Sequence, residues 1–180
     1  MKDRFLQQAK REYSPNQRSA ALAVEAVIFI GILPLALLLL GGVLDRRLGW
    51  PKLTLQPVNA IVGALLIGSG WGLGLWSNYV QFTLGRGTPV PLMATQKLIL
   101  QPPYAYCRNP MALGAIVLYL GVCVAAGSPG AGLLWLLGAV ALLAYIRLVE
   151  EQEMVARFGE EYKVYRRRVP FIIPRLRRSS

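Results

Sequence analysis

Long apolar runs separated by short polar segments dominate this chain of 180 residues. Two runs, residues 20–44 and 58–84, each exceed the ~20 residues that a helix needs to cross ~30 Å of hydrocarbon. A third, residues 111–148, is too long for one helix, and AGSPG at 126–130 marks a tight turn within it. The pattern predicts an all-α, polytopic membrane protein with four transmembrane helices, the third of them short, at residues 20–44, 58–84, 111–126 and 131–148.

A second periodicity follows the last apolar run. Apolar residues recur at spacings of three and four along one face, which is typical of an amphipathic helix lying at a membrane surface. They are Val155, Phe158, Tyr162, Tyr165 and Val169. We therefore expect a C-terminal interfacial helix. We also expect one membrane domain over residues 1–180, divided into a two-span region at 1–84 and a region at 85–180 that carries the polar motifs.

Composition agrees with this pattern. Hydrophobic residues make up 54% of the chain and charged residues only 16%, whereas soluble domains are about 25% charged. A chain of this length is one domain's worth of material and leaves no room for a separate soluble catalytic module. Any chemistry is therefore expected on the helices or their short loops. Glycines in the second run, at 63, 68, 70, 72 and 74, predict close helix packing there.

Positive charge predicts the orientation. With four spans, the N-terminal segment, the 85–110 loop and the C-terminal tail share one side, and they carry 5, 3 and, with Arg147 at the end of the fourth span counted in the tail, 9 of the 20 Lys and Arg residues. The positive-inside rule places that side, with both termini, in the cytoplasm, and we expect a bacterial-type plasma membrane. The net charge of +11 is then explained by anionic lipid headgroups, and no nucleic-acid partner is expected because no base-reading motif accompanies it.

The supply of metal ligands and nucleophiles is small. The chain has two cysteines, Cys107 and Cys123, no CxxC motif and no histidine, so we expect no metal site and no His general base. Cys107 beside Arg108 could be a nucleophile, since a nearby cation lowers a thiol pKa. Because a positioned His is missing, we favour the interpretation that Cys107 is a small apolar residue at the end of a loop.

Glu25 is unusual because it lies inside the first apolar run. An acidic group there is costly in lipid unless it lies near the interface, is buried among helices or has a function. Its position close to the cytoplasmic end favours a side chain that reaches out to the interface.

Three polar motifs on the expected cytoplasmic side are not explained by membrane insertion. They are LGRGTPVP at 84–91, YCRNP at 106–110 and the adjacent Glu150 and Glu151. A glycine pair lets backbone approach an anionic group, although it more often ends a helix. Asn109 before Pro110 is typical of a capped helix start, and a helix N-terminus also attracts carboxylates and phosphates. The glutamates could simply form a charged turn, with an Arg147–Glu151 pair at i,i+4 spacing.

Taken together, these residues resemble a known family. The matching segments are GRGTP at 85–89, YAYCRNPMALG at 104–114, Glu150 with Glu151, and FGEEYKVYRRRVPFIIP at 158–174. Their order and spacing are similar to those of the small integral-membrane methyltransferases related to isoprenylcysteine carboxyl methyltransferase and phosphatidylethanolamine N-methyltransferase. The resemblance covers residues 84–174, while the first two spans match only in hydrophobicity.

The resemblance implies that the 85–180 region binds S-adenosylmethionine in a pocket facing the cytoplasm, with a hydrophobic or lipid acceptor reached from the bilayer. It assigns the cofactor contacts to the glycine pair, the stretch before the turn, the turn itself and the glutamates. These residues are Gly85, Gly87, Gln96, Lys97, Leu98, Ile99, Tyr104, Arg108, Asn109, Pro110, Met111, Ala112, Glu150 and Glu151. Many relatives have histidine at position 109 and an aromatic residue at 112, so we expect Asn109 to bind the cofactor without acid–base chemistry.

Roles follow from the chemistry of this cofactor. Glu150 and Glu151 can accept hydrogen bonds from its ribose or ammonium, while Arg108 and Asn109 can meet its carboxylate. We take Glu150 and Arg147 as the catalytic candidates, with Arg147 holding an anionic acceptor. The acceptor could be an isoprenylcysteine-like carboxylate, which needs no base, a phospholipid amine, which must lose a proton, or a small hydrophobic thiol.

Two other functions stay open at this point. One is an NADPH-dependent membrane reductase related to sterol reductases, whose C-terminal half is similar. The other is a non-catalytic membrane scaffold, which predicts that the polar motifs do not converge in space.

Overall fold

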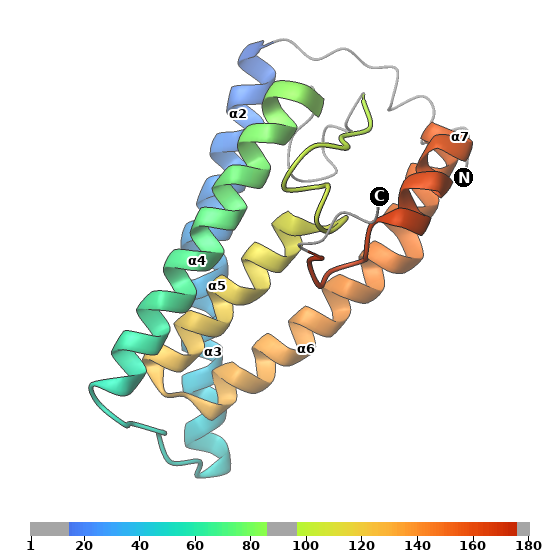
Figure 1. Ribbon diagram of the computed structural model, residues 1–180. Helices are drawn as coiled ribbons and strands as arrows, with labels where there is room; N and C mark the ends of the chain where they lie inside the picture. The colour runs from blue at the N-terminus through green and yellow to red at the C-terminus, as the bar shows by residue number, and fades with distance from the viewer. Residues whose placement is uncertain (1–14, 86–96, 176–180) are drawn as a thin grey trace.

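The computed structural model describes residues 15–85 and 97–175, and every regular element within these ranges is helical. Figure 1 shows the helices as a tilted bundle. In chain order the elements are α2 (Pro15–Ala26), η1 (Val27–Ile32), α3 (Leu33–Leu48), α4 (Val58–Val80), η2 (Gln81–Gly85), α5 (Pro110–Ala126), α6 (Pro129–Tyr145), η3 (Ile146–Glu150) and α7 (Glu151–Arg168). The three η elements are π-helical segments in which a helix widens by one residue per turn.

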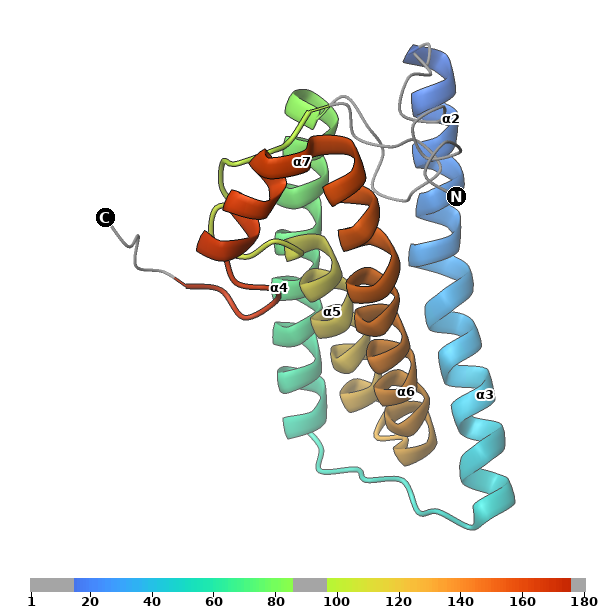
Figure 2. The ribbon, with the colours of Figure 1, turned by 90° about the vertical axis from the view of Figure 1, so that its right-hand side faces the viewer.

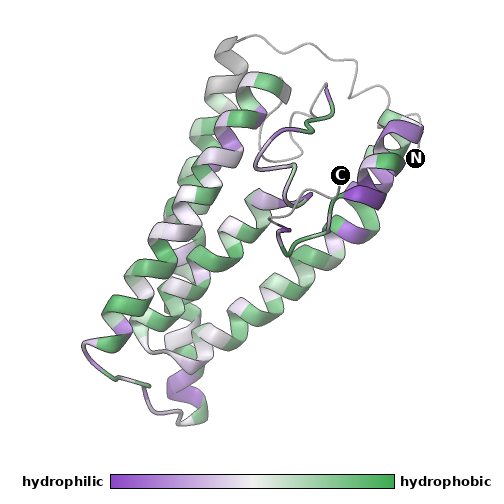
Figure 3. Cartoon of the chain, in the orientation of Figure 1, coloured by the Kyte–Doolittle hydropathy of each residue, from purple (hydrophilic) through white to green (hydrophobic). Residues whose placement is uncertain are grey.

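Membrane-spanning length is present in three continuous helices. Leu22–Leu48, Val58–Gly85 and Pro129–Arg168 are each long and apolar enough to cross a bilayer, and Pro110–Ala126 is a shorter apolar helix of 17 residues. Figure 3 shows the apolar colour along these helices and polar positions gathered toward their ends. The prediction of an all-α, polytopic membrane protein with a short third helix is thus confirmed.

Small residues hold the two central helices together. α4 and α5 pack along their length, and a Cβ added at Gly70 would lie 2.5 Å from the backbone nitrogen of Leu118. At Gly63 the same atom would lie 2.7 Å from Ala125 Cβ. Gly68, Gly72 and Gly74 have open space instead. The expected glycine packing is therefore confined to one face of α4, because only Gly63 and Gly70, two helical turns apart, point at α5.

The far end of the bundle is fixed by a buried carboxylate. Asp45 at the end of α3 is only 6% exposed, and it accepts hydrogen bonds from the Ser128 hydroxyl and from the backbone N–H of Gly130. Ser128 in turn caps α6 by accepting from the N–H of Ala131 at 3.0 Å. Because capping satisfies N–H groups that a helix start leaves free, this contact joins α3 to α6 at a defined register.

The last span continues into the C-terminal helix. α6 passes through η3 into α7 without a loop, and Gly159, with φ of 55°, bends α7. Figure 2 shows α7 turning across the end of the bundle. Tyr162 and Tyr165 of the predicted apolar stripe are buried against protein. Part of this stripe is therefore used for packing, and an interfacial location of α7 stays a prediction.

A hydrogen bond from another helix reaches the first span one turn before Pro34. Within η1 the N–H of Leu33 donates to Ile28 O, five residues earlier, so the next N–H in this register would serve Phe29 O. Residue 34 is a proline and has no N–H. The hydroxyl of Tyr119 on α5 donates to Phe29 O instead, at 2.7 Å. This hydrogen bond ties the first span to the centre of the bundle.

Candidate active site

A cavity of about 820 Å³ lies between the first span, α4, the segment before α5, α5 itself and the α6–α7 junction. Polar and apolar lining residues lie at different depths along their helices. On α4 the polar Asn78 lies toward the 97–110 segment, and Trp71 and Ile67 lie deeper. On α5 the lining continues from Met111 into the bundle as far as Val122. The cavity therefore has a polar end and an apolar depth.

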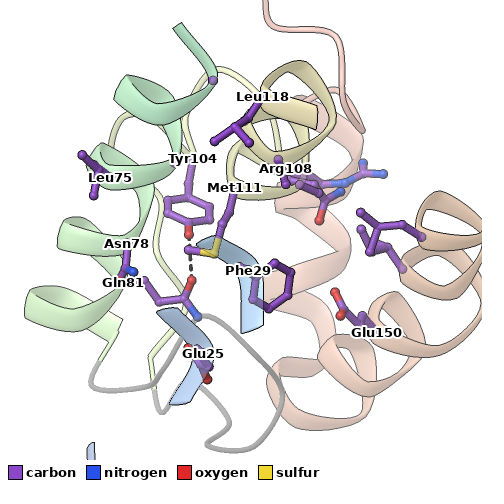
Figure 4. A pocket seen from close by; sticks show the side chains of 18 of the residues that line it. Glu25, Phe29, Leu75, Asn78, Gln81, Tyr104, Arg108, Met111, Leu118 and Glu150 are labelled. Atoms are coloured by element: carbon purple, nitrogen blue, oxygen red, sulfur yellow. Dashed lines mark hydrogen bonds between the residues drawn. The ribbon is translucent and has the colours of Figure 1, made fainter. Parts of the chain in front are cut away.

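Tyr104 stands at the polar end. Its hydroxyl donates to Gln81 Oε1 at 2.8 Å (Figure 4), and its carbonyl accepts from the Tyr165 hydroxyl at 2.7 Å. Burial raises the pKa of Tyr104 far above its usual range, so its hydroxyl stays protonated and acts as a donor. The 101–110 turn is thereby fixed both to η2, which continues α4, and to α7.

Arg108 is held mostly by its own chain. One guanidinium nitrogen donates to the Glu151 carboxylate, and another donates to the carbonyls of Arg166 at 2.6 Å and Val169 at 3.0 Å. The guanidinium also lies 5.7 Å from the centre of the Phe171 ring. Its Nε is buried and has no hydrogen-bond partner within the described residues. Most of the guanidinium therefore holds the turn in place, and only the N–H of Nε has no hydrogen-bond acceptor within the described residues.

Asn109 precedes α5 as expected, but its side chain makes no capping bond. Its Nδ2 donates instead to the carbonyl of Phe171 at 2.9 Å. Backbone bonds join the same two segments, from Arg108 N–H to Pro170 O and from Arg175 N–H to Tyr106 O. The expectation of an Asn109 side-chain cap is wrong, because the returning C-terminal segment takes up that amide.

The two adjacent glutamates differ in their surroundings. Glu151 is 3% exposed and bonds to Arg108, with Arg147 and Arg166 nitrogens each 3.9 Å from its second oxygen. Glu150 is half-buried, lines the cavity and makes no hydrogen bond or ion pair within the described residues. In Figure 4 its side chain lies across the cavity from Tyr104 and Gln81. Glu151 is thus a structural partner of Arg108, and Glu150 is available to a ligand.

Ten of the residues chosen from the sequence line the same cavity. They are Lys97, Leu98, Ile99, Tyr104, Arg108, Asn109, Met111, Ala112, Glu150 and Glu151. Gly85 and Pro110 are buried and do not line it, and Gly87 and Gln96 lie outside the described residues. Arg147 is not brought to the cavity either: its side chain is 61% exposed and its guanidinium lies 5.5 Å from the centre of the Phe171 ring.

Cys107 is 1% exposed, and burial raises the pKa of its thiol. Both observations agree with a small packed residue, since a reactive cysteine needs access and a lowered pKa.

A family model described as phospholipid methyltransferase matches residues 58–161, more than half of the chain. The chain belongs to this family. It is 35% identical over 107 residues to methanethiol S-methyltransferase 2 of Bradyrhizobium diazoefficiens, covering 57% of this chain and 36% of that protein. It is 26% identical over 131 residues to methanethiol S-methyltransferase of Mycobacterium tuberculosis, covering 66% of this chain and 51% of that protein. The chain thus matches about a third to a half of the length of these relatives. No solved structure matches it.

The phospholipid methyltransferase segment begins at α4 and ends within α7, so it includes the 101–110 turn and both glutamates. The first span lies outside it, yet this span also lines the cavity through Glu25. Glu25 is 5% exposed, so the expectation that its side chain reaches out to the interface is wrong. Gln81 and Asn78 also line the cavity and were not among the residues chosen from the sequence. An acidic residue within an apolar run was the one signal that could have pointed to this side of the cavity.

Proposed function

We propose that this integral membrane protein is an S-adenosylmethionine-dependent methyltransferase that acts on a hydrophobic acceptor. The observation that carries the proposal is that one cavity is lined both by the polar Tyr104, Asn109 and Glu150 and by apolar residues of the spans. The two parts suit two ligands, a polar donor and an apolar acceptor, held side by side. Membership of the family supports methyl transfer over nicotinamide-dependent reduction and over a scaffold.

The residues present fit the proposed cofactor. The cavity volume lies within the range of about 300–1,000 Å³ that is usual for ligand sites. The buried Nε of Arg108 has no partner within the described residues and can donate to a carboxylate, as can backbone N–H groups at the start of α5, where Met111 and Ala112 line the cavity. Glu150 can accept from an ammonium or a ribose hydroxyl. S-adenosylmethionine supplies an activated methyl group on a sulfonium.

The tasks left to the protein are binding and positioning. Methyl transfer from a sulfonium is a displacement in which proximity and orientation supply most of the rate, so no covalent intermediate is needed. Tyr104 and Asn109 are themselves fixed by Gln81 and Phe171, which gives the polar end a defined shape. Apolar residues such as Trp71 and Leu118 exclude water from the depth of the cavity.

The comparisons bear on the acceptor. The names of the two relatives specify methanethiol, and the description of the family specifies phospholipids. Both acceptors partition into or cross a bilayer, which agrees with a cavity bounded by membrane-spanning helices. A thiol, an amine and a carboxylate all suit a displacement of this kind.

We also propose that the polar end faces the cytoplasm. Arg166, Arg167 and Arg168 form the last turn of α7 at this end of the bundle, and Arg175 follows that helix. Arg46 and Arg47 are at the far end of the bundle, beside Asp45. The side with more positive charge is the cytoplasmic one in most membrane proteins.

The proposal is tested by donor binding. Purified protein in detergent is titrated with radiolabelled S-adenosylmethionine, and Glu150→Gln is compared with Glu161→Gln, an exposed acid on α7 that does not line the cavity. Loss of a charged hydrogen-bond acceptor costs ~1.5–3 kcal/mol, so we expect Glu150→Gln to weaken binding about tenfold or more. Glu161→Gln should bind as the wild type does. Equal affinity in all three proteins, or no binding by the wild type, would contradict the proposal.

A further inference from the structure

One face of α4 lines the cavity. Its lining residues recur at the spacing of a single helical face, from the depth of the cavity to its polar end. They are Ile67, Gly70, Trp71, Gly74, Leu75, Asn78 and Gln81. Asn78 is the innermost amide on this face, and the lining residues deeper in the bundle carry neither a charge nor an amide. The polar end of the cavity therefore meets the apolar depth at Asn78.

The amide of Asn78 differs from the other Ser and Asn side chains of α4. The hydroxyls of Ser69 and Ser77 donate to carbonyls of their own helix, at 3.0 Å and 2.7 Å. The amide of Asn59, at the start of α4, bonds to three backbone groups. Asn78 is half-buried and makes no hydrogen bond within the described residues. Because an unbonded amide is costly in a membrane-spanning helix, Asn78 is suited to a ligand in the cavity.

Gly74, one helical turn deeper than Asn78, leaves open space in the cavity wall. A Cβ added at Gly74 would meet no atom within 4 Å, and the same is true of Gly68 and Gly72. Those two glycines are exposed and do not line the cavity, whereas Gly74 is half-buried and does. Helix α5 passes close beside Gly74, since a Cβ added at Gly114 would lie 2.9 Å from the Gly74 nitrogen. The space over Gly74 is therefore part of the cavity.

The proposed donor has its partners on other elements. Its carboxylate suits the Nε of Arg108 and the start of α5, and its ammonium or ribose suits Glu150. In Figure 4 Asn78 projects from α4 on the side of Gln81, while Glu150 lies on another side of the cavity. Asn78 and Gly74 thus stand at the boundary where the methyl group of the donor would meet a molecule lying in the apolar depth.

We propose that Asn78 and Gly74 form the seat of the methyl acceptor. The amide of Asn78 holds the reacting head by a hydrogen bond, and the space over Gly74 takes the first carbons of the apolar group attached to that head. This inference rests on the proposed methyltransferase function and names the residues that select its acceptor. The lining continues from this seat along Trp71 and Leu118, so the selected acceptor carries an apolar group of several carbons.

Both contacts of this seat act on position. A displacement needs the attacking atom in line with the bond that breaks, and a head held at one wall approaches from a fixed direction. A side chain at position 74 would fill the space beside that head. It would push a long apolar group out of line and still leave room for a short one. Selectivity for chain length is therefore the property that identifies the seat, because a general loss of structure would affect short and long acceptors alike.

The first test compares Gly74→Leu with Gly72→Leu. Both changes add the same side chain to α4, in the cavity at position 74 and on the exposed face at position 72. Transfer from labelled S-adenosylmethionine to ethanethiol, octanethiol, ethylamine and octylamine is measured with full-length protein in nanodiscs. We expect Gly74→Leu to lower kcat/KM at least tenfold for the octyl acceptors and less than about threefold for the ethyl acceptors. Gly74→Ala should show a smaller loss in the same direction, and Gly72→Leu should match the wild type.

The second test removes the amide at position 78. Leucine is similar in size to asparagine, so Asn78→Leu keeps the wall of the cavity and loses the hydrogen bond. We expect Asn78→Leu to lower kcat/KM about tenfold for whichever octyl acceptor the wild type uses, the usual order for one lost hydrogen bond. Asn78→Gln, which keeps an amide, should recover part of this loss. The Kd for S-adenosylmethionine should stay within about twofold of the wild type in every variant, which also shows that each variant is folded.

The outcomes separate this inference from the proposed function. Equal effects of Gly74→Leu and Gly72→Leu, or equal losses for the octyl and ethyl acceptors, overturn the inference. A tenfold loss of donor affinity in Gly74→Leu or Asn78→Leu also overturns it, because the seat would then belong to the donor. If the wild type binds the donor and methylates none of the four acceptors, the inference is wrong while donor binding still stands. If the wild type binds no donor at all, the methyltransferase function falls, and the acceptor seat falls with it.

Discussion

Arg108 is surrounded by partners from its own chain. Its guanidinium bonds to Glu151 and to the carbonyls of Arg166 and Val169, and its backbone N–H bonds to Pro170 O. From the sequence, Arg108 was expected to meet the carboxylate of a cofactor. Only its Nε is left for that purpose within the described residues. Arg108 is therefore first a support that holds the turn against the C-terminal segment.

Replacing Arg108 by methionine should cost stability. The change leaves the carboxylate of Glu151, which is 3% exposed, without its main partner, and removing one member of a buried ion pair typically costs ~3–5 kcal/mol. We expect a clear drop in the thermal unfolding midpoint in detergent. Arg167→Met, at an exposed position on α7, should leave the midpoint nearly unchanged. Equal midpoints for the two variants would show that the Arg108–Glu151 contact does not stabilise the fold.

The same residues show what the sequence could and could not predict. The motif YCRNP could be singled out from the sequence because a polar turn beside an apolar helix is a local pattern, and its Arg108 and Asn109 line the cavity. The partners of Arg108 and Asn109 lie 43 to 62 residues further along the chain. No local spacing reports such pairing. The sequence could not show that Glu151 bonds to Arg108 while Glu150 lines the cavity without such a bond. The two residues are neighbours in sequence and differ only in what packs around them.

At the scale of elements, Pro34 and Tyr119 form a matched pair. The proline removes the N–H that would serve Phe29 O, and the Tyr119 hydroxyl supplies a donor from another helix. The first span would otherwise carry an unsatisfied carbonyl in the membrane, which is costly because no water is there to bond to it. The contact also fixes the wall that carries Glu25.

A double-mutant cycle tests this pair. Tyr119→Phe should destabilise the protein by ~0.5–1.5 kcal/mol, the net worth of one hydrogen bond. In a Pro34→Ala background the restored N–H can serve a carbonyl of η1, so the same change should cost less. We expect the difference to appear as a coupling in the free energy of unfolding. Tyr79→Phe, at a position 69% exposed, should show no coupling to Pro34→Ala, and additive effects at positions 34 and 119 would contradict the pairing.

The elements themselves were the most predictable part of the fold. Helix length and apolar content follow from runs of residues, so the spans, the short third helix and the turn at 126–130 could be read from the chain. Which face of a helix turns inward depends on its neighbours. In the first span nearly every residue is apolar, so only the acidic Glu25 distinguished the face that lines the cavity.

At the scale of the whole molecule, the cavity joins the segment that the family model matches to a span outside that segment. The phospholipid methyltransferase segment, residues 58–161, supplies the polar end through the turn and Glu150. The first span, outside that segment, supplies a wall of the apolar depth. Under the proposed function, the polar end would hold the donor and the apolar wall would contact the acceptor.

The central claim is that this cavity transfers a methyl group to an apolar molecule, and labelled methyl transfer tests it most directly. Full-length protein in nanodiscs of native lipid is incubated with S-adenosylmethionine carrying a labelled methyl group, with and without octanethiol, and the organic phase is counted over time. We expect label to accumulate there with wild-type and Glu161→Gln protein and to fall at least tenfold with Glu150→Gln. Binding of the donor with no label in the organic phase from any acceptor would contradict the claim.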